Sequence, residues 1–141
     1  VRRLKYHDLQ MFHTIDSLWS DLEEGYTFNF EIENKKYTQK DDTFISTYTL
    51  KDTASAKRVY RKNILKKGVL FGLSTLEDSL ATPSEFVNNF YETFTPIDTL
   101  LGKDVFADKT AIFFNGLKNN DSIVLKSYAK IKKVDSFLQT Q

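Results

Sequence analysis

The chain opens with apolar residues spaced as they are in a helix. Over residues 4–24 the apolar side chains fall on one narrow arc at 3.6 residues per turn: Leu4, Met11, Phe12, Ile15, Leu18, Trp19 and Leu22. Asp16 and Asp21 lie on the opposite side, and Gly25 is a residue that commonly ends helices. The pattern predicts one amphipathic helix over residues 4–24, with Trp19 in the core.

The pattern then changes to the alternation of strands. Apolar and polar residues alternate over residues 26–33, which predicts a half-buried strand. Asn34–Lys36 is a turn candidate, and Thr43–Leu50, rich in Thr, Ile, Phe and Tyr, predicts a second strand. Together these two strands would form an antiparallel hairpin with a charged connection at Gln39–Asp42.

A helix of about four turns is predicted next. Asp52 or Thr53 can cap its start and Gly68 can end it. Its apolar side would hold Ala56, Val59, Tyr60 and Ile64. The short apolar run Val69–Leu73 predicts a buried strand.

Two later segments match the capping box, in which Ser or Thr is followed three residues later by Glu. They are Ser74–Glu77 and Thr82–Glu85, and the second has Pro83 at the favoured first helical position. It predicts a helix whose aromatic face, Phe86 to Phe94, belongs to the core. A further helical turn is predicted at Thr95–Asp98.

The last third of the sequence gives mixed signals. Thr110–Phe114 predicts a strand and Lys118–Asp121 a turn. Residues 122–132 alternate in a way that favours a second hairpin, but an amphipathic helix from Asn120 or Asp121 is the rival interpretation, so strand or helix stays open over residues 120–134.

These elements predict an α+β fold, in which an N-terminal amphipathic helix and further helices pack on antiparallel β-hairpins. The composition, with 40% hydrophobic and 14% aromatic residues and a net charge of +1, is typical of a folded domain and not of a disordered chain. We expect residues 1–141 to form a single globular domain, which can be a piece of a longer protein.

Most catalytic equipment is missing from the sequence. Cysteine is absent, which removes disulfides, zinc–thiolate sites and thiol nucleophiles. His7 and His13 are six residues apart, so on a helix they cannot hold one metal ion together. The sequence contains no glycine-rich phosphate loop and no G-x-S-x-G elbow. We therefore expect no cofactor and no metal site, and we favour a non-catalytic function over an enzymatic one.

Two basic groups stand out against the near-neutral total. In the predicted second helix, cations share one broad arc without an acid among them: Lys57, Arg58, Arg61, Lys62 and Lys66. On the predicted C-terminal strand, lysines share a face with an aromatic ring: Lys126, Tyr128, Lys130 and Lys132. Such groups can bind phosphates and stack on a base, or bind an acidic protein. They are more typical of a solvated helix face and of a lysine-protected edge strand than of nucleic-acid contact.

These observations predict a non-catalytic interaction or scaffold domain of a larger intracellular assembly, with a protein partner. One alternative is a nucleic-acid-binding domain that uses the basic faces 57–66 and 126–132. Another is a small enzyme or ligand-binding domain whose site, built from scattered acids, Tyr and His, is not visible in the sequence. The sequence has no apolar run of eighteen residues and no apolar segment typical of a signal peptide, so we expect no membrane span.

Overall fold

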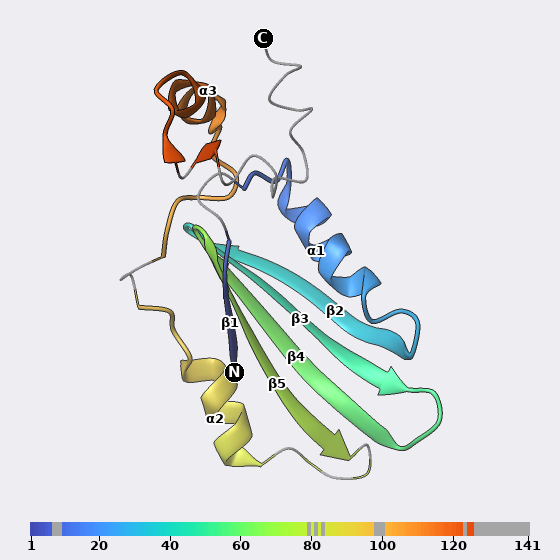
Figure 1. Cartoon of the computed structure of the whole chain (residues 1–141). Helices are drawn as coiled ribbons and strands as arrows, with labels where there is room; N and C mark the ends of the chain where they lie inside the picture. The colour runs from blue at the N-terminus through green and yellow to red at the C-terminus, as the bar shows by residue number, and fades with distance from the viewer. Residues whose placement is uncertain are drawn as a thin grey trace.

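The computed structural model describes residues 1–6, 10–78, 80, 82, 84–97, 101–122 and 124–125. In this part of the chain, five strands form one antiparallel sheet in the order β1-β5-β4-β3-β2, and three helices lie around it (Figure 1). The elements are β1 (Arg2–Lys5), α1 (Ile15–Glu24), β2 (Phe30–Lys40), β3 (Thr43–Asp52), β4 (Lys57–Lys66), β5 (Val69–Asp78), α2 (Glu85–Thr93) and α3 (Thr110–Lys118). The predicted α+β class is confirmed.

Strands β2 to β5 follow one another as hairpins. The pairs Lys40–Thr43 and Lys66–Val69 each close a two-residue turn. The first turn residues, Asp41 and Lys67, have φ angles of 53° and 52°, as tight hairpin turns require. Gly68 follows Lys67, and a Cβ there would lie 2.5 Å from the carbonyl oxygen of Lys103, so only glycine fits.

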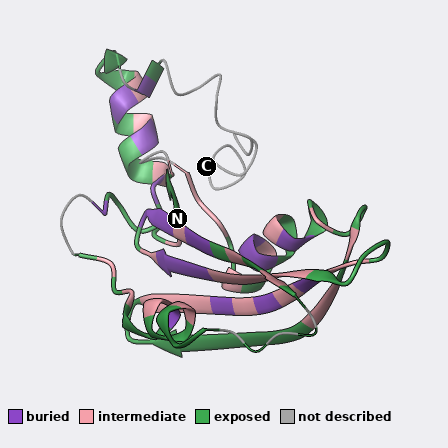
Figure 2. Ribbon diagram, turned by 90° about the horizontal axis from the view of Figure 1, so that it is seen from below, coloured by how far each residue is buried: buried purple, intermediate pink, exposed green. Residues whose placement is uncertain are grey.

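Helices α1 and α2 lie on opposite sides of the sheet (Figure 1). We call the side that holds Leu65 and Leu70 the α1 face, because these residues pack with Leu18 and Trp19 of α1 and with Val105. Figure 2 shows buried residues on the strands and on the inner side of this helix. The α1 face therefore carries one part of the core.

The other side of the sheet, the α2 face, carries a second cluster. Ile64 and Leu73 of the sheet pack with Tyr91 of α2. The hydroxyl of Tyr91 donates a hydrogen bond to the carbonyl oxygen of Tyr60 at 3.2 Å and lies 3.1 Å from the hydroxyl of Thr75. These contacts fix the position of α2 on β4 and β5.

The helix predicted over residues 4–24 is present only over its second half. Arg2–Lys5 is strand β1, which pairs with β5, and residues 7–9, with His7, lie outside the described residues. The helix begins at Ile15 because the hydroxyl of Thr14 accepts a hydrogen bond from the N–H of Ser17 at 3.2 Å.

The predicted turn at Asn34–Lys36 is wrong, because these residues lie within β2. The pairing of β2 with β3 shifts between Glu33 and Lys36, and Asn34 has a φ of 54°. A β-bulge inserts an extra residue in this way, and asparagine tolerates positive φ. Residues typical of a turn therefore bend the strand without ending it.

The predicted second helix is also wrong, because Lys57–Lys66 forms β4. Helices cover both faces of this strand, so it has apolar residues on both faces and lacks the alternation of a half-buried strand. Asp52 caps no helix. Its carboxylate accepts a hydrogen bond from the N–H of Ala54 at 2.9 Å and shapes the β3–β4 turn, and this bond lowers the pKa of Asp52.

The predicted strand at Val69–Leu73 is confirmed but continues to Asp78, so the capping box at Ser74–Glu77 begins no helix. The aromatic helix is present as α2. Its cap is Ser84, whose hydroxyl accepts from the N–H of Val87 at 3.3 Å. Residues 95–97 are not helical, and residues 98–100 lie outside the described part of the chain.

The strand predicted at Thr110–Phe114 is wrong, because these residues begin α3. Phe113 packs with Val124, and Gly116, one turn later, also faces Val124. Ser122, Val124 and Leu125 are helical, which contradicts the favoured hairpin where it can be tested. Residues 126–141 lie outside the described residues, and with them Lys126, Tyr128, Lys130 and Lys132.

Candidate functional site

The five cations predicted to share one helical arc are divided by the sheet. Successive residues of a strand point to opposite faces, so Lys57 and Arg61 lie on the α1 face. Arg58, Lys62 and Lys66 lie on the α2 face. The predicted continuous basic surface is therefore absent, because the segment has the period of a strand.

On the α2 face, acids accompany the basic residues. The guanidinium of Arg58 lies 3.9 Å from the carboxylate of Glu33. The amine of Lys62 donates a hydrogen bond to the carbonyl oxygen of Tyr91. Burial lowers the pKa of Lys62, and the nearby carboxylate of Glu92 opposes this shift. These side chains serve contacts within the fold.

A cleft of about 340 Å³ separates the end of α2 from the sheet. It brings together two of the predicted basic residues, Lys62 and Lys66, with a third lysine, Lys40. Three acids line the same cleft: Asp41, Asp42 and Glu92. Because lysines and acids balance, the cleft does not offer the positive surface that a polyanion needs.

A different feature is the outer edge of β5, where part of the backbone pairs with no described strand. The short strand β1 pairs only with Val69–Gly72, whereas β5 continues to Asp78. Among the described residues, no strand pairs with the outer side of Ser74–Asp78.

The register of the sheet shows which backbone groups point outward there. The N–H of Tyr6 donates a hydrogen bond to the carbonyl oxygen of Gly68 at 2.8 Å, so the backbone groups of Gly68 point toward β1. Because this direction alternates along a strand, the even-numbered residues of β5 direct their N–H and C=O groups away from β4. The same alternation places outward-pointing N–H and C=O groups at Ser74, Leu76 and Asp78. All three residues are exposed, and 67% of the Leu76 surface is accessible to solvent.

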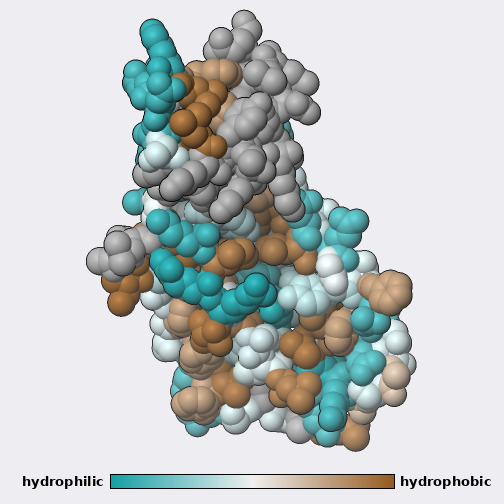
Figure 3. Space-filling view, in the orientation of Figure 1, coloured by the Kyte–Doolittle hydropathy of each residue, from teal (hydrophilic) through white to brown (hydrophobic). Residues whose placement is uncertain are grey.

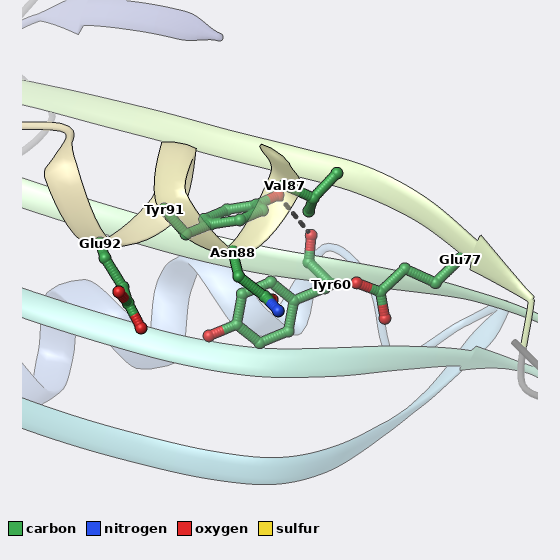
Figure 4. Close-up of a pocket in the computed structure, with 6 residues that line it drawn as sticks. All are labelled: Tyr60, Glu77, Val87, Asn88, Tyr91 and Glu92. Atoms are coloured by element: carbon green, nitrogen blue, oxygen red, sulfur yellow. Dashed lines mark hydrogen bonds between the residues drawn. The ribbon is translucent and has the colours of Figure 1, made fainter. Parts of the chain in front are cut away.

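Two hollows lie beside this edge on the α2 face. One, of about 210 Å³, lies between the end of β5 and the start of α2, and its lining includes Thr75, Glu77, Ser84 and Val87. The other, of about 290 Å³, shares Glu77 and Val87 with the first. Figure 4 shows the second hollow, which is lined by Tyr60, Glu77, Val87, Asn88, Tyr91 and Glu92. Both hollows can accept side chains.

The other sheet edges are protected against pairing. Strand β2 is bulged at Asn34 and carries exposed lysines at positions 35, 36 and 40. Strand β1 carries three charged residues, Arg2, Arg3 and Lys5. Bulges and charges are the usual protection of an edge. Ser74–Asp78 of β5 has no bulge and no lysine, and its charged residues are the acids Glu77 and Asp78.

Large apolar side chains are exposed near this edge. Leu76, Leu80 and Phe86 have accessible fractions of 67%, 90% and 79%. Figure 3 shows apolar side chains interspersed with polar ones over the lower half of the molecule. The sequence carries no direct signal for this edge, because the capping box at Ser74–Glu77 masks the second half of β5.

The described residues show neither a cluster of metal-ligating side chains nor a membrane-spanning helix. No group of three or more His, Asp or Glu side chains in this part of the chain is placed to hold a metal ion. None of its helices has the length and apolar character needed to cross a bilayer. Comparison of the chain with protein-family models, curated proteins and solved structures found no match.

Proposed function

We propose that this chain is a non-catalytic interaction domain that binds an extended segment of a partner protein along the free edge of β5. The observation that carries the proposal is the stretch Ser74–Asp78, whose outer side pairs with no described strand. In strand addition, backbone hydrogen bonds supply affinity, and pockets for alternate side chains supply specificity. The edge and the adjacent hollows offer both.

The geometry defines what the partner segment looks like. It lies in line with β1 and spans about five residues, or roughly 17 Å at the rise of a strand. Side chains opposite Thr75 and Glu77 point to the α2 face and its hollows. Side chains opposite Ser74 and Leu76 point to the α1 face, where the exposed side chain of Leu76 gives an apolar contact.

A displayed library of random dodecapeptides, selected on residues 1–141, tests this proposal. We expect selected peptides, made synthetically, to bind the wild type in a fluorescence anisotropy titration. Leu76→Pro removes an outward N–H without removing a bond to β4, because edge positions tolerate proline. It should weaken binding at least about tenfold, the effect of about 1.4 kcal/mol.

Leu76→Ala is the matched control, because it shortens the same side chain and keeps the N–H. It should bind clearly better than Leu76→Pro. Peptides that bind Leu76→Pro as tightly as wild type would overturn the proposal. So would a selection that yields no binder, or light scattering that shows the edge occupied by a second copy of the chain.

N-methylation of the peptide tests the same contact without changing the fold of the domain. A bound strand directs every second N–H toward β5. Methylation at one set of alternate positions should abolish binding, and methylation at the other set should leave it intact. Equal effects at both sets would contradict strand addition.

A further inference from the structure

The hollow drawn in Figure 4 has an aromatic wall between α2 and the sheet. The rings of Tyr60, on β4, and Tyr91, on α2, meet at 86° with their centres 4.8 Å apart. Tyr91 is buried, and its hydroxyl donates a hydrogen bond to the carbonyl oxygen of Tyr60, which holds the two residues together. Tyr60 is half-buried and lines the hollow, so part of its ring can contact a ligand.

Two carboxylates line the hollow on either side of this wall. Glu77 reaches it from β5 and Glu92 from α2, and Figure 4 shows them on opposite sides of the Tyr60 ring. Among the described residues, neither carboxylate forms an ion pair. The cross-strand neighbour of Glu77 is Arg58, whose guanidinium lies instead 3.9 Å from the carboxylate of Glu33.

The cation next to the hollow is engaged in the fold. The amine of Lys62 is near the carboxylate of Glu92, but it donates its hydrogen bond to the carbonyl oxygen of Tyr91. Lys62 does not line the hollow, and the lining, within the part of the chain that the structure describes, contains no lysine or arginine. A cation from outside would therefore meet two acids and no competing cationic side chain there.

The arrangement of ring and acids suits a guanidinium group. A guanidinium stacks on an aromatic ring, and its N–H groups fan out in one plane, where carboxylates on both sides of the ring can accept them. An ammonium group is a compact point charge without this fork. The charge and the aromatic wall together therefore favour arginine over lysine.

We propose that this hollow binds the side chain of an arginine in a partner protein. Its volume of about 290 Å³ lies below the range of about 300–1,000 Å³ that is typical of pockets for drug-sized ligands, so it suits a single side chain. A free arginine fits less well, because its α-carboxylate would find no cationic side chain in the described lining. The site goes beyond strand addition and does not rest on it, because its lining belongs to β4, β5 and α2 alone.

A titration of residues 1–141 with acetyl-arginine N-methylamide, followed by nuclear magnetic resonance, tests the proposal. We expect saturable binding with a dissociation constant in the millimolar range, as is usual for so small a ligand, and the largest amide shifts at Glu77, Asn88 and Glu92. The corresponding citrulline compound has the same shape without the charge, so it should bind at least about tenfold more weakly. Free arginine should also bind more weakly than the blocked compound.

The double variant Glu77→Gln, Glu92→Gln keeps the size of both side chains and removes their charge. It should bind acetyl-arginine N-methylamide at least about tenfold more weakly than the wild type. Glu85→Gln is the matched control, because it removes a charge from the same helix outside the hollow, and it should bind like the wild type.

Equal binding of the arginine and citrulline compounds would overturn the proposal. So would equal binding by the double variant and the wild type, tighter binding of free arginine than of the blocked compound, or the lack of saturable binding. The selected peptides and their N-methylated forms decide strand addition at β5 separately. Either proposal can therefore fail while the other stands.

Discussion

Trp19 occupies the position where the helical spacing of the sequence predicts a core side chain. Its accessible fraction is 3%, and it packs with Leu18, Leu65, Leu70 and Val105. A single sequence could predict this burial because the helix turns one narrow stripe toward the sheet. It could not predict the partners, since Leu65 belongs to a segment whose pattern predicts a helix and is instead buried in strand β4.

Replacing Trp19 by alanine should lower the free energy of unfolding by about 3–5 kcal/mol, through reduced burial and the cavity that remains. The midpoint of urea unfolding measures the change. Leu80→Ala is the control, because the side chain of Leu80 is 90% accessible and its removal should cost less than about 0.5 kcal/mol. Equal midpoints for Trp19→Ala and wild type would show that α1 is not part of the core.

Tyr37 and Glu23 form a second contact between α1 and the sheet. The hydroxyl of Tyr37 donates to the buried carboxylate of Glu23, and the amine of Lys35 lies 3.2 Å from the same carboxylate. Burial, together with this hydrogen bond, raises the pKa of Tyr37 well above its ordinary value of 10.0. The folded protein therefore holds this proton more tightly than the unfolded chain does.

The stability that this contact supplies should be complete below about pH 10 and should fall as the pH rises further, because the unfolded chain loses the tyrosine proton first. Unfolding midpoints between pH 8 and 11 measure this. Burial also raises the pKa of Tyr6, Tyr48 and Tyr91, so Tyr37→Phe should make the decline shallower without removing it. Identical pH profiles for Tyr37→Phe and wild type would contradict the assignment.

At the scale of elements, prediction succeeded for α2 and β3 and failed for β4 and α3. β3 has aromatic and β-branched residues at strand spacing, and α2 has a cap with an apolar face. β4 is covered on both faces, so its apolar residues follow no single period. The choice between helix and strand there depended on pairing with β3 and β5, which are distant contacts that a local pattern does not contain.

The start of α2 provides a prediction at this scale. Ser84 accepts from the N–H of Val87, so Ser84→Ala should cost about 0.5–2 kcal/mol in the free energy of unfolding. Thr82 stands at the first position of the capping box in the sequence, but α2 begins only after Ser84. Thr82→Ala should therefore leave the urea midpoint almost unchanged. A larger destabilisation by Thr82→Ala than by Ser84→Ala would place the cap at residue 82.

At the scale of the molecule, the sheet decides which charges can act together. Arg58 and Arg61 are three residues apart and would share one side of a helix, but in β4 they lie on opposite faces. Arg58 is close to Glu33, whereas Arg61 lacks an acid partner among the described residues. The sequence could predict a basic segment, but only the strand assignment shows that one flat partner cannot contact all of it.

This division gives a test of the alternative that the chain binds nucleic acid. If the chain binds a fluorescent oligonucleotide at low salt, Arg61→Glu should lower the affinity more than Arg58→Glu does. The double variant should then bind the oligonucleotide no more weakly than Arg61→Glu alone. The slope of log affinity against log salt should fall by about 0.7–0.9 for each phosphate that the variant no longer neutralises. Titrations at two salt concentrations measure both effects. Equal and additive reductions in affinity would contradict the division of Arg58 and Arg61 between the two faces of the sheet. No binding by the wild type at low salt would exclude nucleic acid as the partner of this surface.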